Sequence, residues 1–317
     1  MIDLFHALHA HFVTVTSPFA LQAALSPAPG VPWSVRVPDP RFGEVTLRGR
    51  LSDTGSKTLF VLVHGLGGSS DSLYLVAAAH ELGRMGLSCL RISMRGGELD
   101  GEDTYHAGIS QDLHAALAHP SLAHFERIFL IGFSLGGHIT LKAATEEDRD
   151  PRVAGVAAIC APLELSLSQR MLDRTRRTLY RAYILNALKA IWHAVDARGR
   201  ASVPYANVQR IRSLRAWDEA VVVPRFGFAG ADDYYDSMSV SRRLRKLDLP
   251  ALYVGTLHDP VVRAESVQPA LAQAKGCVEA HWSAEGGHVY MFHKLDLGLP
   301  TKDYLVPQVL RWLERNA

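Results

Sequence analysis

Residues Arg127–Ala143 read R-I-F-L-I-G-F-S-L-G-G-H-I-T-L-K-A, and their pattern changes half-way from that of a strand to that of a helix. Ile128–Phe133 is a short, uncharged apolar run, which is typical of a buried strand. From Leu135 onward an apolar residue recurs every four positions, which predicts a helix. Ser134 stands at the junction, inside a G-x-S-x-G pattern. Because a strand that turns sharply into a helix exposes such a serine at its tip, we predict that Ser134 is a catalytic nucleophile.

The glycines of this pattern fit a tight junction. A side chain at Gly132 or Gly136 would collide with the neighbouring element, which explains glycine at both positions. The first N–H groups of the helix would point toward a negative charge that develops beside the serine. The alternative is a chance match, which arises in roughly one chain of this length in ten. Because few chance matches fall between a strand and a helix, the sequence favours the nucleophile.

The composition indicates which classes of protein are compatible with this chain. The chain has 317 residues, 48% of them hydrophobic, which is enough for one large domain or a domain with an insertion. Its 34 basic and 32 acidic residues nearly balance and form no basic run, so we expect no nucleic-acid partner. Cys89, Cys160 and Cys277 lie in or beside apolar runs without metal-binding spacing, which indicates core thiols and neither a disulfide nor a metal site. No apolar run is long enough to span a membrane, and we expect a soluble, cytoplasmic protein.

Strand-like and helix-like segments alternate along most of the chain. An antiparallel pair at a sheet edge is predicted over Trp33–Pro38 and Glu44–Leu51. The later alternation predicts a mostly parallel sheet that is covered by helices on both faces, which is an α/β fold. The later predicted strands are Thr58–Val63, Gly86–Ser93, Ile128–Phe133, Val153–Ala161, Pro250–Gly255 and Cys277–Trp282, and the predicted helices are Asp71–Met85, Ala107–Ala118, Ser237–Lys246, Ala264–Ala274 and Tyr304–Arg315.

The alternation stops at Pro162. Residues 163–222 contain no clear strand-like run, and Met171–Val195 has the pattern of a helix. An insertion at this point of the sheet would lie over the carboxyl ends of the strands, so we predict a helical cap over residues 163–222. The α/β core would then comprise residues 32–162 and 223–317.

Residues 1–31 are predicted to be an N-terminal extension. We expect a helix near Ile2–Val13, followed by a Pro-rich connector over Ser26–Pro32. Residues Leu4–Val35 contain no Asp, Glu, Lys or Arg. Packing on the domain explains this stretch, and contact with a membrane surface is the alternative.

Two further reactive side chains follow predicted strands, at the edge of the sheet where ligands bind in folds of this kind. Asp259 lies in T-L-H-D-P and His288 in E-G-G-H. Ser, Asp, His is the chain order of an α/β-hydrolase triad, in which the histidine takes the serine proton and the aspartate orients the histidine. We therefore predict Ser134, Asp259 and His288 as the catalytic residues.

Other residues compete for the acid and the base. Asp232 and Asp233 are the nearest rivals of Asp259, but no clear strand precedes them. His281 lies within the last predicted strand, and His293 lacks the flanking glycines of His288. Because Asp259 and His288 each follow a predicted strand, we favour them as the acid and the base.

The predicted reaction also needs donors for the oxyanion of the tetrahedral intermediate, and two backbone N–H groups can supply them. One belongs to Leu135, directly after the serine. We expect the other at Leu66, in the glycine-rich loop His64–Ser70 that follows a predicted strand. His64 is expected to shape this loop and His138 to pack on the helix after the serine. This chemistry requires no metal and no organic cofactor.

Several stretches carry a resemblance to a known group and together cover most of the chain from about residue 40. They are H-G-L-G-G-S-S at 64–70, Y-H-A-G at 105–108, G-F-S-L-G-G at 132–137, C-A-P-L-E-L at 160–165, G-F-A-G-A-D-D-Y-Y at 227–235 and E-G-G-H at 285–288. With them the chain resembles the YheT-like α/β-hydrolases, a group of esterases, lipases and acyltransferases. The resemblance implies the α/β-hydrolase fold and a triad of Ser134, Asp259 and His288. The turn Arg95–Glu98 departs from the cysteine-containing turn of that group, and we expect a changed pocket entrance.

The leading hypothesis is a serine hydrolase that cleaves carboxylic esters through an acyl-enzyme. A capped pocket favours a small-molecule ester with an aliphatic acyl chain over a peptide. An acyltransferase that passes the acyl group to an alcohol is an open alternative, since the second step depends on how well the site excludes water. A hydrolase fold without activity, used as a binding module, is the third hypothesis. The oligomeric state stays open.

Overall fold

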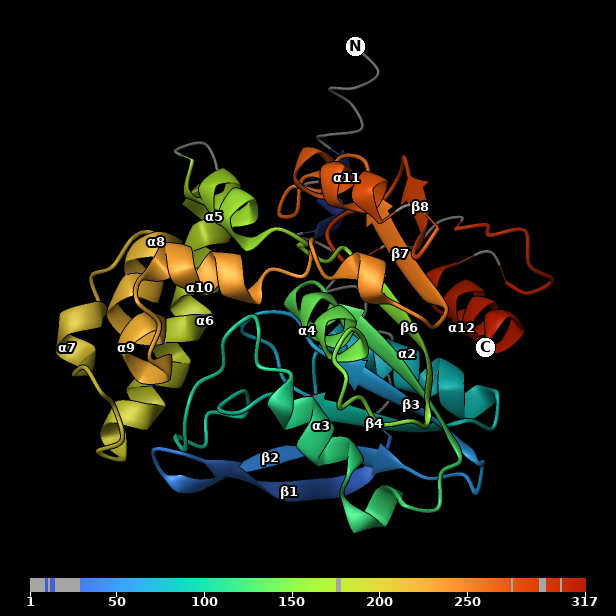
Figure 1. Ribbon diagram of the computed structural model, residues 1–317, viewed down its shortest axis with the longest axis horizontal. Coiled ribbons are helices and arrows are strands. Elements are labelled where there is room, and N and C mark those ends of the chain that lie inside the picture. Colours follow the sequence, from blue (N-terminus) through green and yellow to red (C-terminus); the bar gives the residue numbers. More distant parts are fainter. Residues whose placement is uncertain are drawn as a thin grey trace.

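Eight strands form one sheet in the spatial order β1-β2-β4-β3-β5-β6-β7-β8 (Figure 1). The pairs β1–β2 and β2–β4 are antiparallel, and every other neighbouring pair is parallel. The mostly parallel sheet and its antiparallel edge were both predicted and are confirmed. The strands are β1 (Val31–Asp39), β2 (Gly43–Ser52), β3 (Thr58–Val63), β4 (Ser88–Ser93), β5 (Arg127–Phe133), β6 (Val153–Ile159), β7 (Ala251–Thr256) and β8 (Glu279–Ser283).

The computed structural model describes residues 9–10, 12–14, 29–174, 178–274, 276–290, 295–302 and 304–317. Within these ranges, no helix has the length and apolar character needed to cross a membrane. The helices are α2 (Leu73–Arg84), α3 (Gln111–Leu117), η1 (Pro120–Leu122), α4 (Leu135–Ala144), α5 (Leu165–Asp173), α6 (Thr178–Ala197), α7 (Tyr205–Val208), α8 (Leu214–Trp217), η3 (Asp218–Val222), α9 (Val223–Phe226), α10 (Ala231–Met238), η4 (Leu244–Lys246), α11 (Ala264–Gln273) and α12 (Leu305–Asn316).

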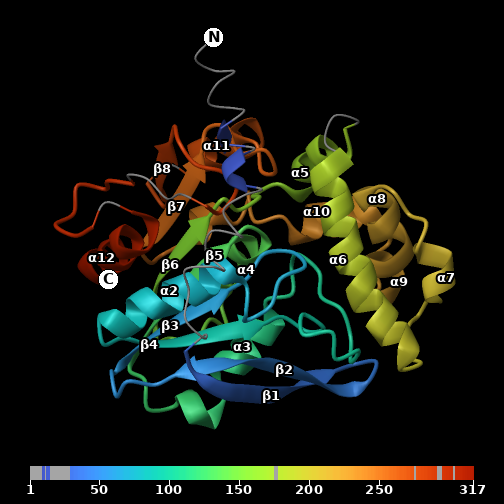
Figure 2. The same cartoon turned by 180° about the vertical axis from the view of Figure 1, so that it is seen from behind.

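Helices cover both faces of the sheet, because successive strand side chains point to opposite faces and both sets are apolar. In β3, Phe60 and Leu62 pack with α2 and α12 in one buried cluster. Leu59 and Val61 pack with α3, α4 and α11 in the other. Figure 1 shows α3 and α4 in front of the sheet, and Figure 2 shows α2 and α12 on the opposite side.

The register of the parallel strands brings their carboxyl ends to one edge. Val63 of β3 pairs with Gly132 of β5, and Ile159 of β6 pairs with Val254 of β7. These residues are at or near the last positions of their strands. The loops after β3, β5, β6 and β7 therefore leave the sheet side by side, which places the predicted site residues in one region.

The helices between β6 and β7 differ in two places from those predicted. The single helix expected over Met171–Val195 is interrupted: α5 ends at Asp173 and α6 begins at Thr178. The helix predicted over Ser237–Lys246 is wrong, because α10 already ends at Met238 and only the short 3-10 helix η4 follows. A tertiary contact ends α10, since the Ser239 hydroxyl accepts a hydrogen bond from the N–H of Leu165 at 2.9 Å.

Most of the predicted N-terminal extension lies outside the described residues, and so does most of the helix expected over Ile2–Val13. Residues 9–10 and 12–14, which the structure describes, are helical. Residues 26–28 of the predicted connector are outside the described ranges, and β1 begins at Val31. A contact of this extension with a membrane surface stays a prediction.

Candidate active site

Ser134 stands between β5 and α4 with a backbone φ of 51°. This left-handed conformation is strained for any residue with a Cβ, and its cost is of order 1–3 kcal/mol. The adjacent glycines make the turn possible. A Cβ on Gly132 would overlap the backbone of Gly136, and one on Gly136 would overlap the carbonyl of Val63. The predicted sharp turn at the serine is therefore present, together with the steric reason for its glycines.

Ser134, His288 and Asp259 lie in a line of hydrogen bonds. His288 Nε2 is 2.9 Å from Ser134 Oγ, and His288 Nδ1 is 2.9 Å from Asp259 Oδ2. Asp259 is 1% exposed, and its Oδ1 accepts hydrogen bonds from the N–H groups of Val261 and Val262. The acid is thus held in place by its own loop, with one oxygen free to face the histidine.

This arrangement determines which ring nitrogen carries the proton. A carboxylate accepts hydrogen bonds and does not donate them, so the proton of a neutral His288 belongs on Nδ1, facing Asp259. Nε2 then holds a lone pair directed at the Ser134 hydroxyl. The site can therefore remove a proton from the serine as it attacks, which is general-base chemistry.

The loop His64–Ser70 presents a free N–H beside the serine. On either side of Leu66, the N–H of Gly65 donates to Tyr74 Oη at 2.9 Å and that of Gly67 donates to Tyr105 Oη at 2.6 Å. In contrast, neither the Leu66 nor the Leu135 N–H has a hydrogen-bond acceptor among the residues that the structure describes. Both remain available to an oxyanion. The sequence reasoning missed the two tyrosines, whose position relative to the loop depends on the fold.

The histidines and acids that competed for these roles are placed elsewhere. His64 is buried, and its Nε2 accepts the N–H of Met94 at 3.0 Å. Burial lowers the pKa of His64 to about 4, so the ring is neutral and shapes the loop, as expected. His138 is also fully buried, with its ring nitrogens 2.8 and 3.0 Å from two carbonyl oxygens, which confirms packing.

Of the rival residues, Asp232 is paired with Arg215 on the surface, and Asp233 bonds to the N–H of Ala229. His281 contacts the Glu279 carboxylate at the edge strand β8. His293 lies outside the described residues. Within the described ranges, the residues brought together with Ser134 are therefore those predicted from the strand ends.

The N-terminal extension contributes to the site in a way that the sequence reasoning missed. The N–H of His288 donates to Thr14 Oγ1 at 2.8 Å, and this hydroxyl donates to the carbonyl of Ala10 at 2.8 Å. A Cβ on Gly287 would overlap Thr14, so the glycine beside the histidine permits this approach. The extension thus holds the backbone of the histidine loop.

Cys160 lies next to the acid and the histidine. Its sulfur, an Asp259 oxygen and a His288 nitrogen all lie within 4.8 Å of one another. Burial raises the pKa of the Cys160 thiol well above its usual range, so it stays protonated, in keeping with the predicted core thiol. Both ring nitrogens of His288 already contact other groups. His288 therefore has no nitrogen left to bind a metal ion in this cluster.

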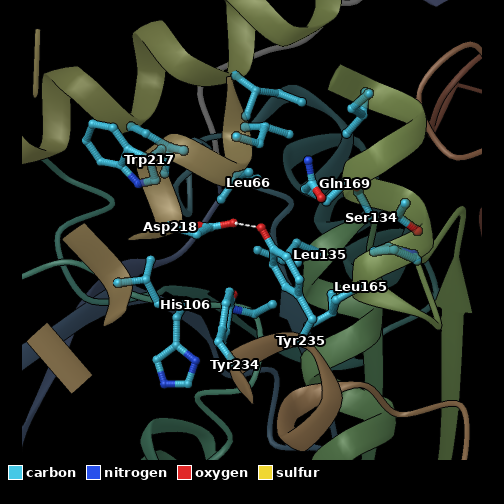
Figure 3. Close-up of a pocket in the computed structure, with 18 of the residues that line it drawn as sticks. Leu66, His106, Ser134, Leu135, Leu165, Gln169, Trp217, Asp218, Tyr234 and Tyr235 are labelled. Atoms are coloured by element: carbon cyan, nitrogen blue, oxygen red, sulfur yellow. Dashed lines mark hydrogen bonds between the residues drawn. The ribbon is translucent and has the colours of Figure 1, made fainter. Parts of the chain in front are cut away.

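A cavity of about 110 Å³ opens beside Ser134, and Leu66 and Leu135 belong to its wall (Figure 3). Most of the lining side chains are apolar, and the helices between β6 and β7 supply a large share of them: Leu165, Leu172, Ile184, Leu188, Leu214, Trp217 and Val222. Figures 1 and 2 both show α5 to α9 gathered at one end of the sheet. The cavity therefore lies between the carboxyl edge of the sheet and these helices.

The turn Arg95–Glu98 does not contribute to the cavity wall in the described part of the chain. Arg95 instead joins a buried ion cluster, in which its Nη1 lies 2.7 Å from Asp39 and 2.9 Å from Asp103, and its Nε lies 2.8 Å from Asp112. Arg225 of α9 completes the cluster, with its Nε 2.8 Å from Asp103. The turn thus connects the helices beside the cavity to the edge of the sheet.

Comparison with known proteins places the chain in a family. A family model described as serine aminopeptidase, S33, matches residues 54–294, well over half of the chain. The chain belongs to this hydrolase family. The resemblance to the YheT-like α/β-hydrolases is confirmed as well.

Three curated relatives of this S33-family hydrolase come from different kingdoms. YheT of Escherichia coli (strain K12), a protein assigned as an esterase, is 26% identical over 273 residues, which cover 80% of this chain and 76% of YheT. A mouse protein named phospholipase ABHD3 is 23% identical, with 75% of this chain and 59% of the relative covered. A Saccharomyces cerevisiae protein named monoacylglycerol lipase is 23% identical, with 67% and 50% covered. The chain therefore spans between half and about three quarters of these relatives.

Solved structures agree on the fold of this S33-family hydrolase. The esterase Pf2001 of Pyrococcus furiosus superposes with a TM-score of 0.57 at 16% identity, covering 94% of this chain and 92% of that one. The α/β-hydrolase GrgF of a Penicillium species gives a TM-score of 0.58 at 19% identity, covering 90% and 99%. With the sheet order above, these likenesses establish the α/β-hydrolase fold.

Proposed function

We propose that this S33-family hydrolase cleaves carboxylic esters through an acyl-enzyme formed on Ser134. The observation that carries the proposal is the unbroken line of contacts from Ser134 Oγ through His288 to the buried Asp259, with 2.9 Å at each step. As Oγ attacks the ester carbonyl carbon, its proton passes to His288 Nε2, and Asp259 stabilises the imidazolium. The N–H groups of Leu66 and Leu135 bind the oxyanion, and loss of one such donor costs about 2.7–4 kcal/mol.

Two successive displacements return the site to its starting state. Collapse of the first tetrahedral intermediate breaks the bond to the leaving oxygen, which takes the proton from His288 and departs as an alcohol. A water molecule then attacks the acyl carbon and gives one proton to His288. When the second intermediate collapses, Ser134 regains that proton and the carboxylic acid is released. No step uses a metal or an organic cofactor.

The apolar cavity supports a small-molecule ester with an aliphatic acyl chain as the substrate. Leucines and other apolar side chains dominate its wall, which suits a hydrocarbon better than a peptide. Relatives named as an esterase, a phospholipase and a lipase agree with an ester. The cytoplasmic location stays a prediction.

The cavity wall supports the proposal that the helices over residues 163–222 form the cap of this site. Several of them supply side chains to the cavity wall, while the sheet and its loops supply the reactive groups. The contiguous helical segment α8–η3–α9 runs past the proposed boundary at Val222 as far as Phe226. We propose residues 32–162 and 223–317 as the core, so the last turn of this segment belongs to the core, where Arg225 pairs with Asp39 and Asp103.

The test is hydrolysis of p-nitrophenyl esters of increasing acyl length by the wild type, by Ser134→Ala and by a control, Ser237→Ala. We expect Ser134→Ala to lose roughly 10⁴-fold or more in kcat, with an unchanged circular dichroism spectrum. Ser237 bonds to the Asp233 carbonyl on α10, away from the cavity, so its variant should retain activity. Activity that survives in Ser134→Ala, or cleavage of an aminoacyl p-nitroanilide in preference to every ester, would contradict the proposal.

An acyl transfer to an alcohol is the second candidate. One Saccharomyces cerevisiae relative, 24% identical over 235 residues, is named medium-chain fatty acid ethyl ester synthase/esterase 2. The same acyl-enzyme would serve, with an alcohol in place of water in the second displacement. Product analysis with added ethanol decides between them, and an absence of ethyl ester at every ethanol concentration removes the transferase.

A further inference from the structure

The helical segment Leu214–Phe226 beside the cavity contains a widened turn. Its middle part, Asp218–Val222, is a π-helix, a conformation frequent at functional sites. Pro224 explains the widening, because proline has no N–H to bond to the carbonyl of Ala220 and its ring would clash with that carbonyl in an α-helix. Asp218 begins the widened turn and lines the cavity, with its carboxyl group on the inner side in Figure 3.

Asp218 is the one acid among the described residues that line the cavity. Its Oδ2 accepts a hydrogen bond from the Tyr235 hydroxyl at 2.6 Å. Its Oδ1 makes no hydrogen bond to any residue that the structure describes. Burial, with the nearby carboxylates of Asp173 and Glu219, raises the pKa of Asp218 to about 7. The half-buried carboxyl group therefore keeps one oxygen free to accept a hydrogen bond.

A second polar group in the same wall lacks a partner. Ser168 is 7% exposed, and its hydroxyl makes no hydrogen bond within the described part of the chain. Gln169, next to it on α5, also lines the cavity, and Figure 3 shows its side chain facing the same space as Asp218. A buried polar atom without a partner destabilises the protein unless a ligand or a water molecule forms a hydrogen bond with it. The cavity wall thus offers two polar atoms, Asp218 Oδ1 and Ser168 Oγ, that can form a hydrogen bond with a ligand.

The geometry also indicates which half of an ester enters the cavity. In the proposed function His288 gives its proton to the leaving alcohol, so the alcohol lies on the side of His288. His288 is not part of the cavity wall, whereas Ser134 and the two oxyanion residues Leu66 and Leu135 are. The acyl half, which stays bonded to Ser134, is therefore the part that extends into the cavity toward Asp218.

We propose that this cavity selects acyl groups that carry a hydroxyl group along or at the end of the chain, with Asp218 and Tyr235 as the specificity-determining pair. The inference rests on the proposed ester hydrolysis and names its substrate class: esters of hydroxylated aliphatic acids. The substrate hydroxyl donates to the free oxygen of Asp218, and the rest of the chain contacts the leucines. A hydroxyl suits this position better than an ammonium group, because it bonds to the neutral and to the ionised carboxyl alike.

The test compares pairs of p-nitrophenyl esters with equal chain lengths, one ending in a methyl group and one in a hydroxyl group, on hexanoyl, octanoyl and decanoyl chains. The quantity is the ratio of kcat/KM for the two esters of a pair, which does not depend on the fraction of enzyme that is folded. An apolar pocket without a polar subsite would disfavour the hydroxyl by roughly a hundredfold. We expect the wild type to hydrolyse the hydroxy ester at least as efficiently at one chain length.

Variants connect this preference to the carboxyl group. Asp218→Leu should lower the ratio roughly tenfold or more, and Asp218→Asn, which keeps an acceptor oxygen, should lower it less. Asp236→Asn is the matched control, since Asp236 is an exposed acid beside Tyr235 on α10 and lies outside the cavity wall; its ratio should equal that of the wild type.

Three results would overturn the inference while ester hydrolysis stands. These are a hydroxy ester disfavoured about a hundredfold at every length, a ratio unchanged within about twofold in both Asp218 variants, or an octanoyl ester with a terminal amino group cleaved faster than the hydroxy ester. A wild type that hydrolyses no ester at all is a different failure, because it removes the proposed function and this inference with it.

Discussion

At the scale of single residues, backbone geometry and hydrogen bonds hold the side chains of the site in one arrangement. Ser134 is held at a φ of 51° by the turn around it. Val289, directly after His288, has a φ of 57°, although it is β-branched and such conformations are costly for it. Strain of this kind persists where the surroundings over-determine it, and it is common at functional sites. In the proposed function, the backbone therefore holds Ser134 and His288 in place before a substrate arrives.

Replacement of the acid tests the proposed role of Asp259. In Asp259→Asn the amide keeps the shape and still accepts from the backbone, but it can place an NH₂ group against His288 Nδ1 and favour the wrong tautomer. We expect kcat for a p-nitrophenyl ester to fall by about 10⁴-fold with the fold retained. Asp232→Asn is the control, because Asp232 was the rival acid and pairs with Arg215 on the surface. Equal losses in the two variants would show that the assignment of the acid is wrong.

At the scale of elements, the helical segment α8–η3–α9 joins the cavity to the core. Asp218 faces the cavity, and Arg225, near the end of the segment, joins the ion cluster with Asp39 and Asp103. Burial works to raise the pKa of Asp39, but hydrogen bonds led by Arg95 outweigh it and hold that pKa at about 2. Asp39 is thus ionised at neutral pH, and the cluster places three buried carboxyl groups around two guanidinium groups.

Removal of one charged side chain from this buried ion cluster should destabilise the folded protein. The Arg225 side chain is 3% exposed, and Arg225→Met leaves buried carboxylates without their countercharge. We expect a loss of about 3–5 kcal/mol in the free energy of unfolding, measured by urea denaturation. Arg215→Met is the matched control on the same helical segment, where the arginine pairs with Asp232 at the surface, and its midpoint should hardly move. Similar losses for the two would contradict a special role of the buried cluster.

The same segment predicts a pH dependence of stability. Asp218 has a folded pKa of about 7 against an ordinary value of 3.8, so its carboxyl group binds a proton more tightly in the folded state. Protonation of Asp218 therefore stabilises the folded protein at low pH, and this stabilisation is lost as pH rises from about 4 to about 7. The difference in unfolding free energy between the wild type and Asp218→Asn should therefore shift against the wild type between about pH 4 and pH 7. Its upper bound is about 4 kcal/mol.

Taking the difference between the two proteins cancels titrating groups that do not interact with Asp218. Asp173, Glu219, Arg215 and Tyr235 do interact with it, and their effect on the pKa of Asp218 is part of the measured difference. A difference that stays flat from pH 4 to pH 7 would mean that Asp218 is solvated in the folded protein, and the cavity would then be wetter than its lining suggests.

At the scale of the whole molecule, the cavity exists because two parts of the chain meet. The carboxyl edge of the sheet presents Ser134 and the donors for the oxyanion, and the helices between β6 and β7 close the space above them (Figure 3). In the proposed function, the helices decide which substrate size fits and the sheet edge supplies the reactive groups. This division predicts that changes in the helices alter which ester is cleaved more than whether one is cleaved.

A larger side chain in the cavity wall tests this division. Leu188 of α6 is 4% exposed and lines the cavity, so Leu188→Trp should shorten the space for the acyl chain. We expect the ratio of kcat/KM for octanoyl to butanoyl esters to fall by roughly tenfold or more. Leu179→Trp, on the same helix at a position that is 67% exposed, should leave the ratio unchanged. A profile that does not move in Leu188→Trp would place the acyl chain outside this cavity.

The amino-acid sequence alone determined the features that depend on local pattern. Alternation of apolar runs predicted the parallel sheet, and β3 has the predicted bounds. Glycines around Ser134 predicted the sharp turn, because the steric conflict that they avoid lies within a few residues. Position after a strand was enough to place Asp259 and His288 near Ser134, because parallel strands end at one edge of a sheet.

The tertiary structure alone decided the features that depend on contacts between distant segments. α10 ends where Ser239 meets Leu165, 74 residues away, and local pattern had predicted a later helix. Thr14 reaches the loop of His288 across 274 residues, and Tyr235 bonds to an acid that has no motif of its own. A hydrogen bond across such a separation depends on where the packed core brings two segments, and neither segment carries a periodicity that reports the other.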